Sequence, residues 1–147
     1  MKLKRLLGYF LIAVPGIGIG LSAYTFYYAR GYSYLLDDPK ACINCHVMRD
    51  NYIAWEVSSH RSVSCNGCHV PNGFLSKYYV KAENGFRHSY VFTFENPQVF
   101  RLAPIGQQTV QANCIRCHEA TVSNVSHGIN DTGMKCFDCH RGVGHAF

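Results

Sequence analysis

Residues 42–69 read CINCHVMRDNYIAWEVSSHRSVSCNGCH, a stretch that begins and ends with Cys-X-X-Cys-His. The same pattern returns twice further along the chain, as CIRCH at 114–118 and CFDCH at 136–140. Together the four motifs use all eight cysteines of the chain: Cys42, Cys45, Cys65, Cys68, Cys114, Cys117, Cys136 and Cys139. No cysteine is left for a structural disulfide or a catalytic thiol.

This spacing is typical of covalent haem c attachment, in which two thiols bond the porphyrin and the next histidine ligates the iron. The sequence therefore predicts four haems c, numbered here 1 to 4 in motif order. Zinc is the alternative, because 19 residues separate Cys45 from Cys65, as in a zinc ribbon. A four-cysteine zinc site does not need the histidine after each pair, so these histidines favour haem: His46, His69, His118 and His140.

Four haems offer eight axial positions, and four histidines lie outside the motifs: His60, His88, His127 and His145. Three of them, His60, His127 and His145, lie within nine residues of a motif, in segments containing Ser and Gly, and are predicted to be distal ligands in loops. Each pair of motifs encloses one of these histidines. The chain is thus expected to form two di-haem halves related by a pseudo-twofold, with His60 and His127 each reaching a haem of the opposite half.

Met48 follows His46 by two residues and offers a thioether. A methionine ligand raises the potential of a haem, whereas a packing methionine fills a gap in a core. The spacing alone does not decide between these two roles.

Residues 74–94 are expected to form a helix with two contrasting faces. Lys77, Lys81, Asn84 and His88 fall within about 60° of one another on the helix. The opposite side carries Leu75, Tyr79, Phe86, Tyr90 and Phe94. One interpretation is a solvated polar stripe over a core-facing aromatic stripe. The other is a cationic, titratable face at the edge of a haem.

Residues 6–29 lack any charged side chain and would span about 36 Å as a helix, enough to cross a bilayer. Lys2, Lys4 and Arg5 precede this segment, so residues 1–5 are expected to be a cytoplasmic tail and residues 30–147 a periplasmic domain. The alternative is a signal peptide cleaved after Ala23, but the apolar run is longer than such peptides need. The first motif begins only about 12 residues after the anchor, so haem 1 must stay within about 40 Å of it.

The formal net charge is +5, and the basic residues form neither a run nor a base-stacking pattern. Nucleic acid is therefore not an expected partner. The propionates and ferric irons of four haems would bring the net charge to about +1 oxidised and about −3 reduced.

Several stretches resemble the NapC/NrfH family of membrane-anchored multihaem quinol dehydrogenases. They are Ser33-Tyr34-Leu35, the segment 38–48 (DPKACINCHVM), Ser58-Ser59-His60, Lys81-Ala82 with Gly85 and His88-Ser89, and the segment 136–145. The similarity spans nearly the whole chain, and the short C-terminus after His145 resembles the NrfH-type members more than the longer NapC type.

The resemblance implies roles for individual residues. Met48 rather than His46 would ligate haem 1, the haem that faces the quinol. Lys81 and His88 match positions that line a menaquinol pocket, where His88 is either a proton acceptor or a sixth ligand of haem 1. His127 would supply a haem ligand that some members draw from a partner subunit.

The predicted fold is mostly α, with one N-terminal transmembrane helix and a small haem-packed domain. The predicted function is oxidation of membrane quinol at the bacterial inner membrane, and the resemblance implies that the quinol is menaquinol. Electrons would pass to a periplasmic reductase. In NrfH-type members of the family this reductase is the catalytic subunit of cytochrome c nitrite reductase, which the resemblance therefore implies as the partner. The alternatives are an electron-transfer module without a quinone site, a NapC-like donor to another reductase, and a terminal reductase.

Overall fold

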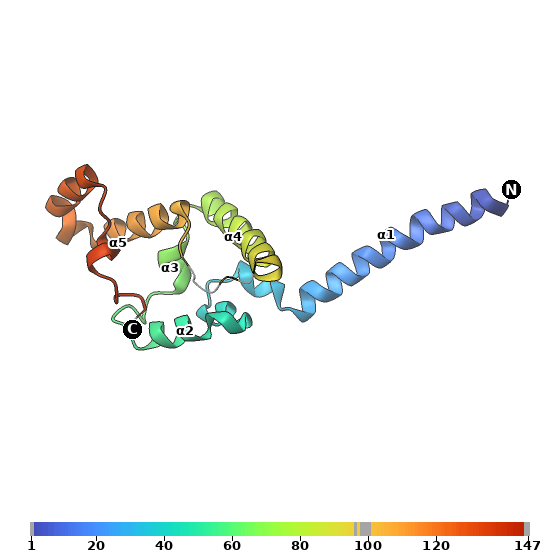
Figure 1. Ribbon diagram of the computed structural model, residues 1–147, viewed down its shortest axis with the longest axis horizontal. Helices are drawn as coiled ribbons and strands as arrows, with labels where there is room; N and C mark the ends of the chain where they lie inside the picture. The colour runs from blue at the N-terminus through green and yellow to red at the C-terminus, as the bar shows by residue number, and fades with distance from the viewer. Residues whose placement is uncertain (1, 96, 98–100, 146–147) are drawn as a thin grey trace. The chain divides into compact units, whose positions relative to one another are not determined.

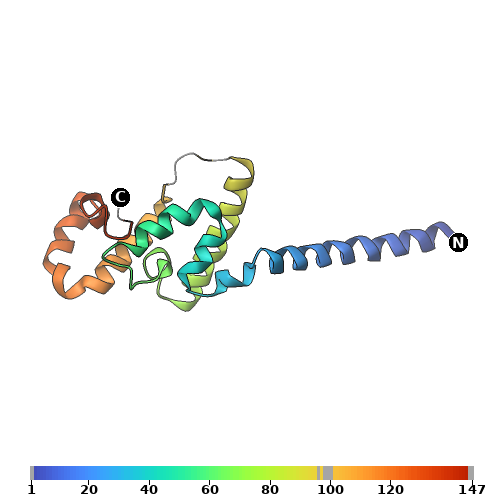
Figure 2. The same ribbon diagram turned by 90° about the horizontal axis from the view of Figure 1, so that it is seen from below.

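The chain divides into two units, residues 1–36 and residues 37–147, which are described separately. The computed structural model describes residues 2–95, 97 and 101–145, the side chains of 126–132 excepted. Within these ranges every regular element is helical, as expected for a mostly α protein. Figures 1 and 2 show the elements of each unit.

The first unit contains α1 (Lys2–Tyr28) and a short 3₁₀ helix, η1 (Gly31–Leu35). The most apolar 18-residue window of α1 has a mean hydropathy of 1.9, and none of that window is buried. Its 27 residues would span about 40 Å. Pro15 lies inside α1, a position that membrane helices tolerate. By length and composition α1 can therefore cross a membrane; the boundaries given above for tail, anchor and domain stay predictions.

The second unit carries the first, second and fourth motifs on short helical turns, and the third motif lies within the long helix α5. The elements of this unit are η2 (Pro39–Asn44), η3 (His46–Met48), α2 (Arg49–Glu56), α3 (Cys65–His69), α4 (Phe74–Phe94), α5 (Pro104–Thr132) and α6 (Cys136–Cys139). Of these, α3 packs against α5, which brings the second and third motifs together (Figure 1).

Local capping places the motif helices. The Ser64 hydroxyl accepts a hydrogen bond from the Gly67 amide at 3.2 Å, which begins α3 at the second motif. The Asp138 carboxylate accepts from the Lys135 amide at 2.7 Å and begins α6 at the fourth motif. Each Cys-X-X-Cys pair then spans one turn, and residues three apart on a helix share a face.

The helix α5 bends at His118, whose φ of −109° and ψ of 16° are not helical. Its two parts therefore run in different directions (Figure 2). The second part ends at Gly133, which adopts the left-handed φ of 70° that glycine favours. His127 lies in this part, so the prediction that it occupies a loop is wrong. Its side chain is outside the described residues.

Side chains fill little of the interior. In the described part of the chain the only buried apolar residues are Ala54, Val70 and Val80, and no large side chain is fully buried. A domain of this size normally needs a substantial apolar core. The protein chain alone does not supply one.

The predicted helix at residues 74–94 is confirmed as α4. Its aromatic stripe is exposed, with Leu75 at 81% and Phe86 at 78% exposure, whereas the Lys81 side chain is only 9% exposed. The interpretation that placed the aromatic stripe against the core is therefore wrong. The two lysines of the cationic face, Lys77 and Lys81, lie inward because they meet the Asp37 carboxylate, whereas His88 on the same face is exposed.

Candidate functional site

The four motifs follow one another in space in chain order. The Cys65 thiol donates a hydrogen bond to the Cys42 sulfur, which lowers the pKa of Cys42 and raises that of Cys65. Burial raises the pKa of Cys68, and the neighbouring Cys117 raises it further. Burial likewise raises the pKa of Cys114, and the neighbouring Cys136 raises it further. Neighbouring motifs thus lie close enough for their cysteines to interact.

Two amide side chains that the sequence analysis did not predict hold these motifs together. The buried Asn113 donates to the carbonyls of Cys68 and Val70, both at 2.9 Å, and ties the second motif to the third. The Gln111 side-chain oxygen accepts from the Cys136 amide at 2.8 Å and ties the third motif to the fourth. Asn113 directly precedes Cys114 and Gln111 lies three residues before it, but an amide near a motif is too common in sequences to signal this role.

Two pairs of histidines face each other across long stretches of sequence. The ring centres of His60 and His118 lie 5.8 Å apart, and those of His69 and His145 lie 6.2 Å apart. Two imidazoles that bind one metal ion through nitrogens at about 2 Å have ring centres about 6 Å apart. Both pairs join a motif histidine to a predicted distal ligand, and His60 meets the opposite half as expected.

Hydrogen bonds orient both distal rings. His145 Nδ1 lies 3.0 Å from the Asn51 carbonyl, which can only accept, so Nδ1 carries the proton and Nε2 the lone pair. His60 Nδ1 lies 3.0 Å from the Ser59 hydroxyl, which donates to the Val143 carbonyl at 3.4 Å. Such contacts to the second ring nitrogen are typical of histidines that bind metals.

Trp55 supports the segment that carries His60. Its indole N–H lies 3.2 Å from the His60 carbonyl and 2.9 Å from the Val63 carbonyl. Trp55 also lines a cavity together with Cys65, Cys68, His69 and His145. Both thiols of the second motif, its histidine His69 and the facing His145 therefore border one space.

For the remaining predicted ligands the structure shows the position in the chain and the exposure. Met48 is half-buried at the end of η3, while His46 at its start is exposed. His140 is exposed at the end of α6. His127 has its side chain outside the described residues, so its role as a distal ligand stays a prediction.

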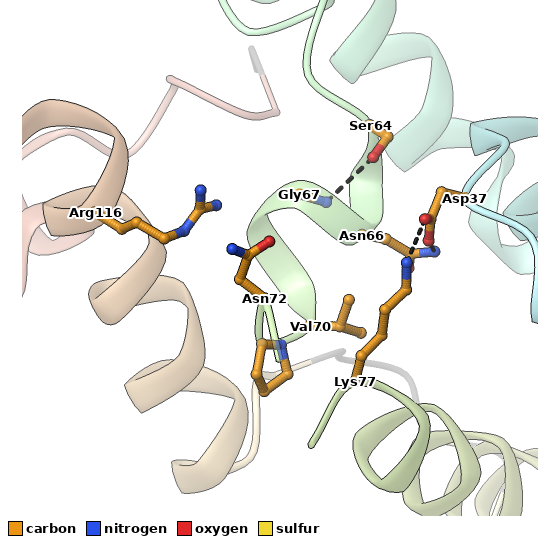
Figure 3. Close-up of a pocket in the computed structure, with 9 residues that line it drawn as sticks. Asp37, Ser64, Asn66, Gly67, Val70, Asn72, Lys77 and Arg116 are labelled. Atoms are coloured by element: carbon orange, nitrogen blue, oxygen red, sulfur yellow. Dashed lines mark hydrogen bonds and ion pairs between the residues drawn. The ribbon is translucent and has the colours of Figure 1, made fainter. Parts of the chain in front are cut away.

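Lys81 lies beside the first motif and contacts Asp37. The Lys81 ammonium is 3.1 Å from Asp37 Oδ1, and its charge adds to the lowering of the Cys42 pKa that the Cys65 hydrogen bond causes. Asn66 donates to Oδ1 at 2.8 Å, and Lys77 pairs with Oδ2. Figure 3 shows Lys77 and Asn66 converging on Asp37 at one side of an open polar cavity of about 140 Å³. Asp37 is outside every motif, and the sequence analysis did not predict it.

His88 shares the face of Lys81 but lies two turns further along α4, about 10 Å along the axis. Its ring centre is 6.0 Å from that of Phe92. Partial desolvation lowers the pKa of His88, and Arg87 lowers it while Glu83 raises it. His88 also contributes, after burial and His145, to lowering the pKa of His69 to about 4. His88 therefore lies close to the second motif as well.

The residues present fit haem c. The paired thiols, the two facing histidine pairs and the sparse core are what covalently bound haems require. The buried side-chain nitrogen of Gln111 also lacks a protein partner. A zinc ribbon instead needs four ligands around one ion. Among the residues that the structure describes, no three His, Cys, Asp or Glu side chains gather around one point.

The fold and the repeated motif define a multihaem cytochrome c. Residues 3–147 match the N-terminal region of the NapC/NirT cytochrome c family, and the chain belongs to this family. It is therefore a c-type cytochrome, and with α1 it is a single-pass membrane protein.

Individual relatives cover most of the chain. Cytochrome c-type protein NrfH of Wolinella succinogenes is 37% identical over 158 aligned positions, covering 99% of this chain and 89% of the relative. Cytochrome c nitrite reductase subunit NrfH of Nitratidesulfovibrio vulgaris is 36% identical, covering 74% and 68%. The crystal structure of the cytochrome c nitrite reductase NrfHA complex bound to the HQNO inhibitor contains a chain with a TM-score of 0.64 and 31% identity, covering 90% and 88%.

Proposed function

We propose that this protein oxidises membrane quinol, in particular menaquinol, and passes the electrons to a periplasmic nitrite reductase. The observation that carries the quinol site is the inward-facing Lys81 beside the first motif. The relatives named as NrfH and the NrfHA complex support nitrite reductase as the partner. The three basic residues before the apolar part of α1 support a periplasmic second unit.

Four haems c would occupy the four motifs. When bound, each haem accepts and passes on one electron at a time. His69 with His145 and His118 with His60 would be two axial pairs, which the ring separations support. His140 and His127 would be further ligands, and Met48 rather than His46 would serve the first motif.

Lys81 and His88 would assist the removal of protons from the quinol. Oxidation of a quinol to the quinone releases two electrons and two protons. The Lys81 ammonium would stabilise the negative charge that develops on a quinol oxygen as its proton leaves. His88 would accept one proton, since desolvation lowers its pKa and keeps the ring neutral near pH 7. The second proton would pass to solvent.

The cofactor content should be four haems c per chain. The reason is that each of the four Cys-X-X-Cys-His motifs supplies the complete attachment chemistry. A pyridine haemochrome assay, scaled to protein concentration by amino-acid analysis, measures the ratio. Two haems accompanied by bound zinc would contradict the assignment.

The partner proposal is tested by reconstitution. The chain in menaquinol-containing liposomes is mixed with a purified catalytic subunit of cytochrome c nitrite reductase, and nitrite consumption is followed. We expect consumption only when chain, quinol and catalytic subunit are all present. Nitrite consumption by the chain without the catalytic subunit would instead indicate a terminal reductase. Quinol oxidation that never leads to nitrite consumption would favour a different reductase.

A further inference from the structure

Asp37 joins three separate parts of the second unit. It lies just before η2 and the first motif, and its carboxylate receives hydrogen bonds from Asn66 of α3 and from Lys77 and Lys81 of α4. Asn66 and Lys81 share Oδ1, at 2.8 Å and 3.1 Å, while Lys77 pairs with Oδ2. The carboxylate is thus held on both oxygens.

The Asp37 carboxylate cannot be the base that takes the quinol proton. The hydrogen bond from Lys77, and then those from Asn66 and Lys81, lower its pKa to about 2. Asp37 is therefore ionised near neutral pH and has little tendency to accept a proton. Its remaining role in this network is to hold its cationic partners.

We propose that Asp37 is the positioning residue for Lys81, holding the ammonium beside the first motif where a quinol oxygen is deprotonated. The proposal rests on the proposed quinol oxidation and adds a residue to it. Lys77 and Asn66 restrain the carboxylate, so that Oδ1 stays directed at Lys81. The Lys81 side chain is only 9% exposed, and its 3.1 Å contact with Oδ1 holds the ammonium at this point in the interior.

The next residue, Asp38, supplies a matched control. Its carboxylate accepts from the Lys40 amide at 2.9 Å and caps η2. Asparagine caps a helix as well as aspartate does, so Asp38→Asn removes one charge and keeps the cap. Asp38 also lies close enough to Cys42 to act on its pKa. Both substitutions therefore remove a negative charge near the first motif, and Asp37→Asn in addition weakens the ion pair that holds Lys81.

The experiment compares Asp37→Asn, Asp38→Asn, Lys81→Ala and the double variant Asp37→Asn/Lys81→Ala in the full chain in menaquinol liposomes. Haem content and dithionite reduction confirm that each variant is loaded. We expect Asp37→Asn to lose about tenfold in kcat for quinol-dependent reduction, with a smaller change in KM, because a misplaced ammonium mainly weakens transition-state binding. Asp38→Asn should stay within about twofold of wild type, since surface changes outside such networks are small. The double variant should be no slower than Lys81→Ala.

A redox titration separates positioning from charge. Loss of either carboxylate should raise the midpoint potential of the first haem, because a nearby negative charge favours the oxidised iron. A higher potential would by itself favour electron acceptance, so a slower Asp37→Asn variant cannot owe its loss to the potential. If Asp37→Asn does not accumulate with haem, Asp37→Glu keeps the charge, shifts the carboxylate by one methylene and should show an intermediate loss.

Three results would overturn the inference while leaving the proposed function intact: wild-type kinetics in Asp37→Asn, an equal loss in Asp38→Asn, or additive losses in the double variant. In each case Lys81→Ala would still be impaired. Wild-type kinetics in Lys81→Ala would instead overturn the quinol site and the positioning role together.

Discussion

Replacement of His145 by alanine should convert one low-spin haem, the one attached to Cys65 and Cys68, to the high-spin state. The reason is that the His145 ring faces His69 at 6.2 Å and is oriented by the Asn51 carbonyl. Without it, the iron of that haem loses one of its two strong-field nitrogen ligands. Electron paramagnetic resonance and the optical spectrum near the high-spin charge-transfer band measure the change.

His60→Ala should have the same effect on the haem attached to Cys114 and Cys117, because His60 faces His118 at 5.8 Å. The matched control is His88→Ala. If His88 is a proton acceptor, its loss leaves all spin states unchanged; if it is a sixth ligand of haem 1, the spectrum of that haem changes. Unchanged spectra in both the His145 and the His60 variant would refute the assignment of the two axial pairs.

Lys81→Ala and His88→Ala should each lose most quinol-dependent reduction, by about 10²-fold if charge stabilisation and general-base catalysis are the main losses. Both should keep four haems and accept electrons from dithionite at the wild-type rate, because neither side chain belongs to a motif. Stopped-flow absorbance with menaquinol and then with dithionite makes the comparison. Wild-type quinol kinetics in both variants would place the pocket elsewhere.

The pH dependence tests the role of His88 separately. A base acts in its neutral form, so the quinol-dependent rate should rise with pH through the pKa of His88 and then level off. Desolvation lowers that pKa from the ordinary value of 6.5, so the inflection should lie below 6.5. The inflection should disappear in His88→Ala, while any dependence that belongs to the quinol itself remains.

Much of the fold could be predicted from local patterns. The haem motifs, the helix at residues 74–94 and the apolar α1 all depend on spacing or composition within one short segment. The pairing of His60 with His118 and of His69 with His145 joins residues more than 50 positions apart. Spacing along the chain carries no information about which distal ring meets which motif.

The orientation of α4 shows why an apolar stripe can mislead. In most helices such a stripe faces a core of side chains, but this interior contains few of them. The Asp37 carboxylate and the first motif instead attract the stripe that carries Lys81. The contact between Asp37 and Lys81 could not be predicted from the sequence, because a single aspartate before a motif has many ordinary roles. The loop expected around His127 was wrong because serine and glycine suggested a break, whereas α5 continues to Thr132.

The most direct test of the account is whether the chain alone takes electrons from quinol. The purified chain is reconstituted in liposomes without any reductase, mixed anaerobically with menaquinol, and followed at the reduced-haem α band. We expect menaquinol to reduce the haems, and we expect Lys81→Ala to slow this reduction about 10²-fold. Full reduction by dithionite with none by menaquinol would contradict it and would indicate an electron-transfer module that receives its electrons from another membrane protein.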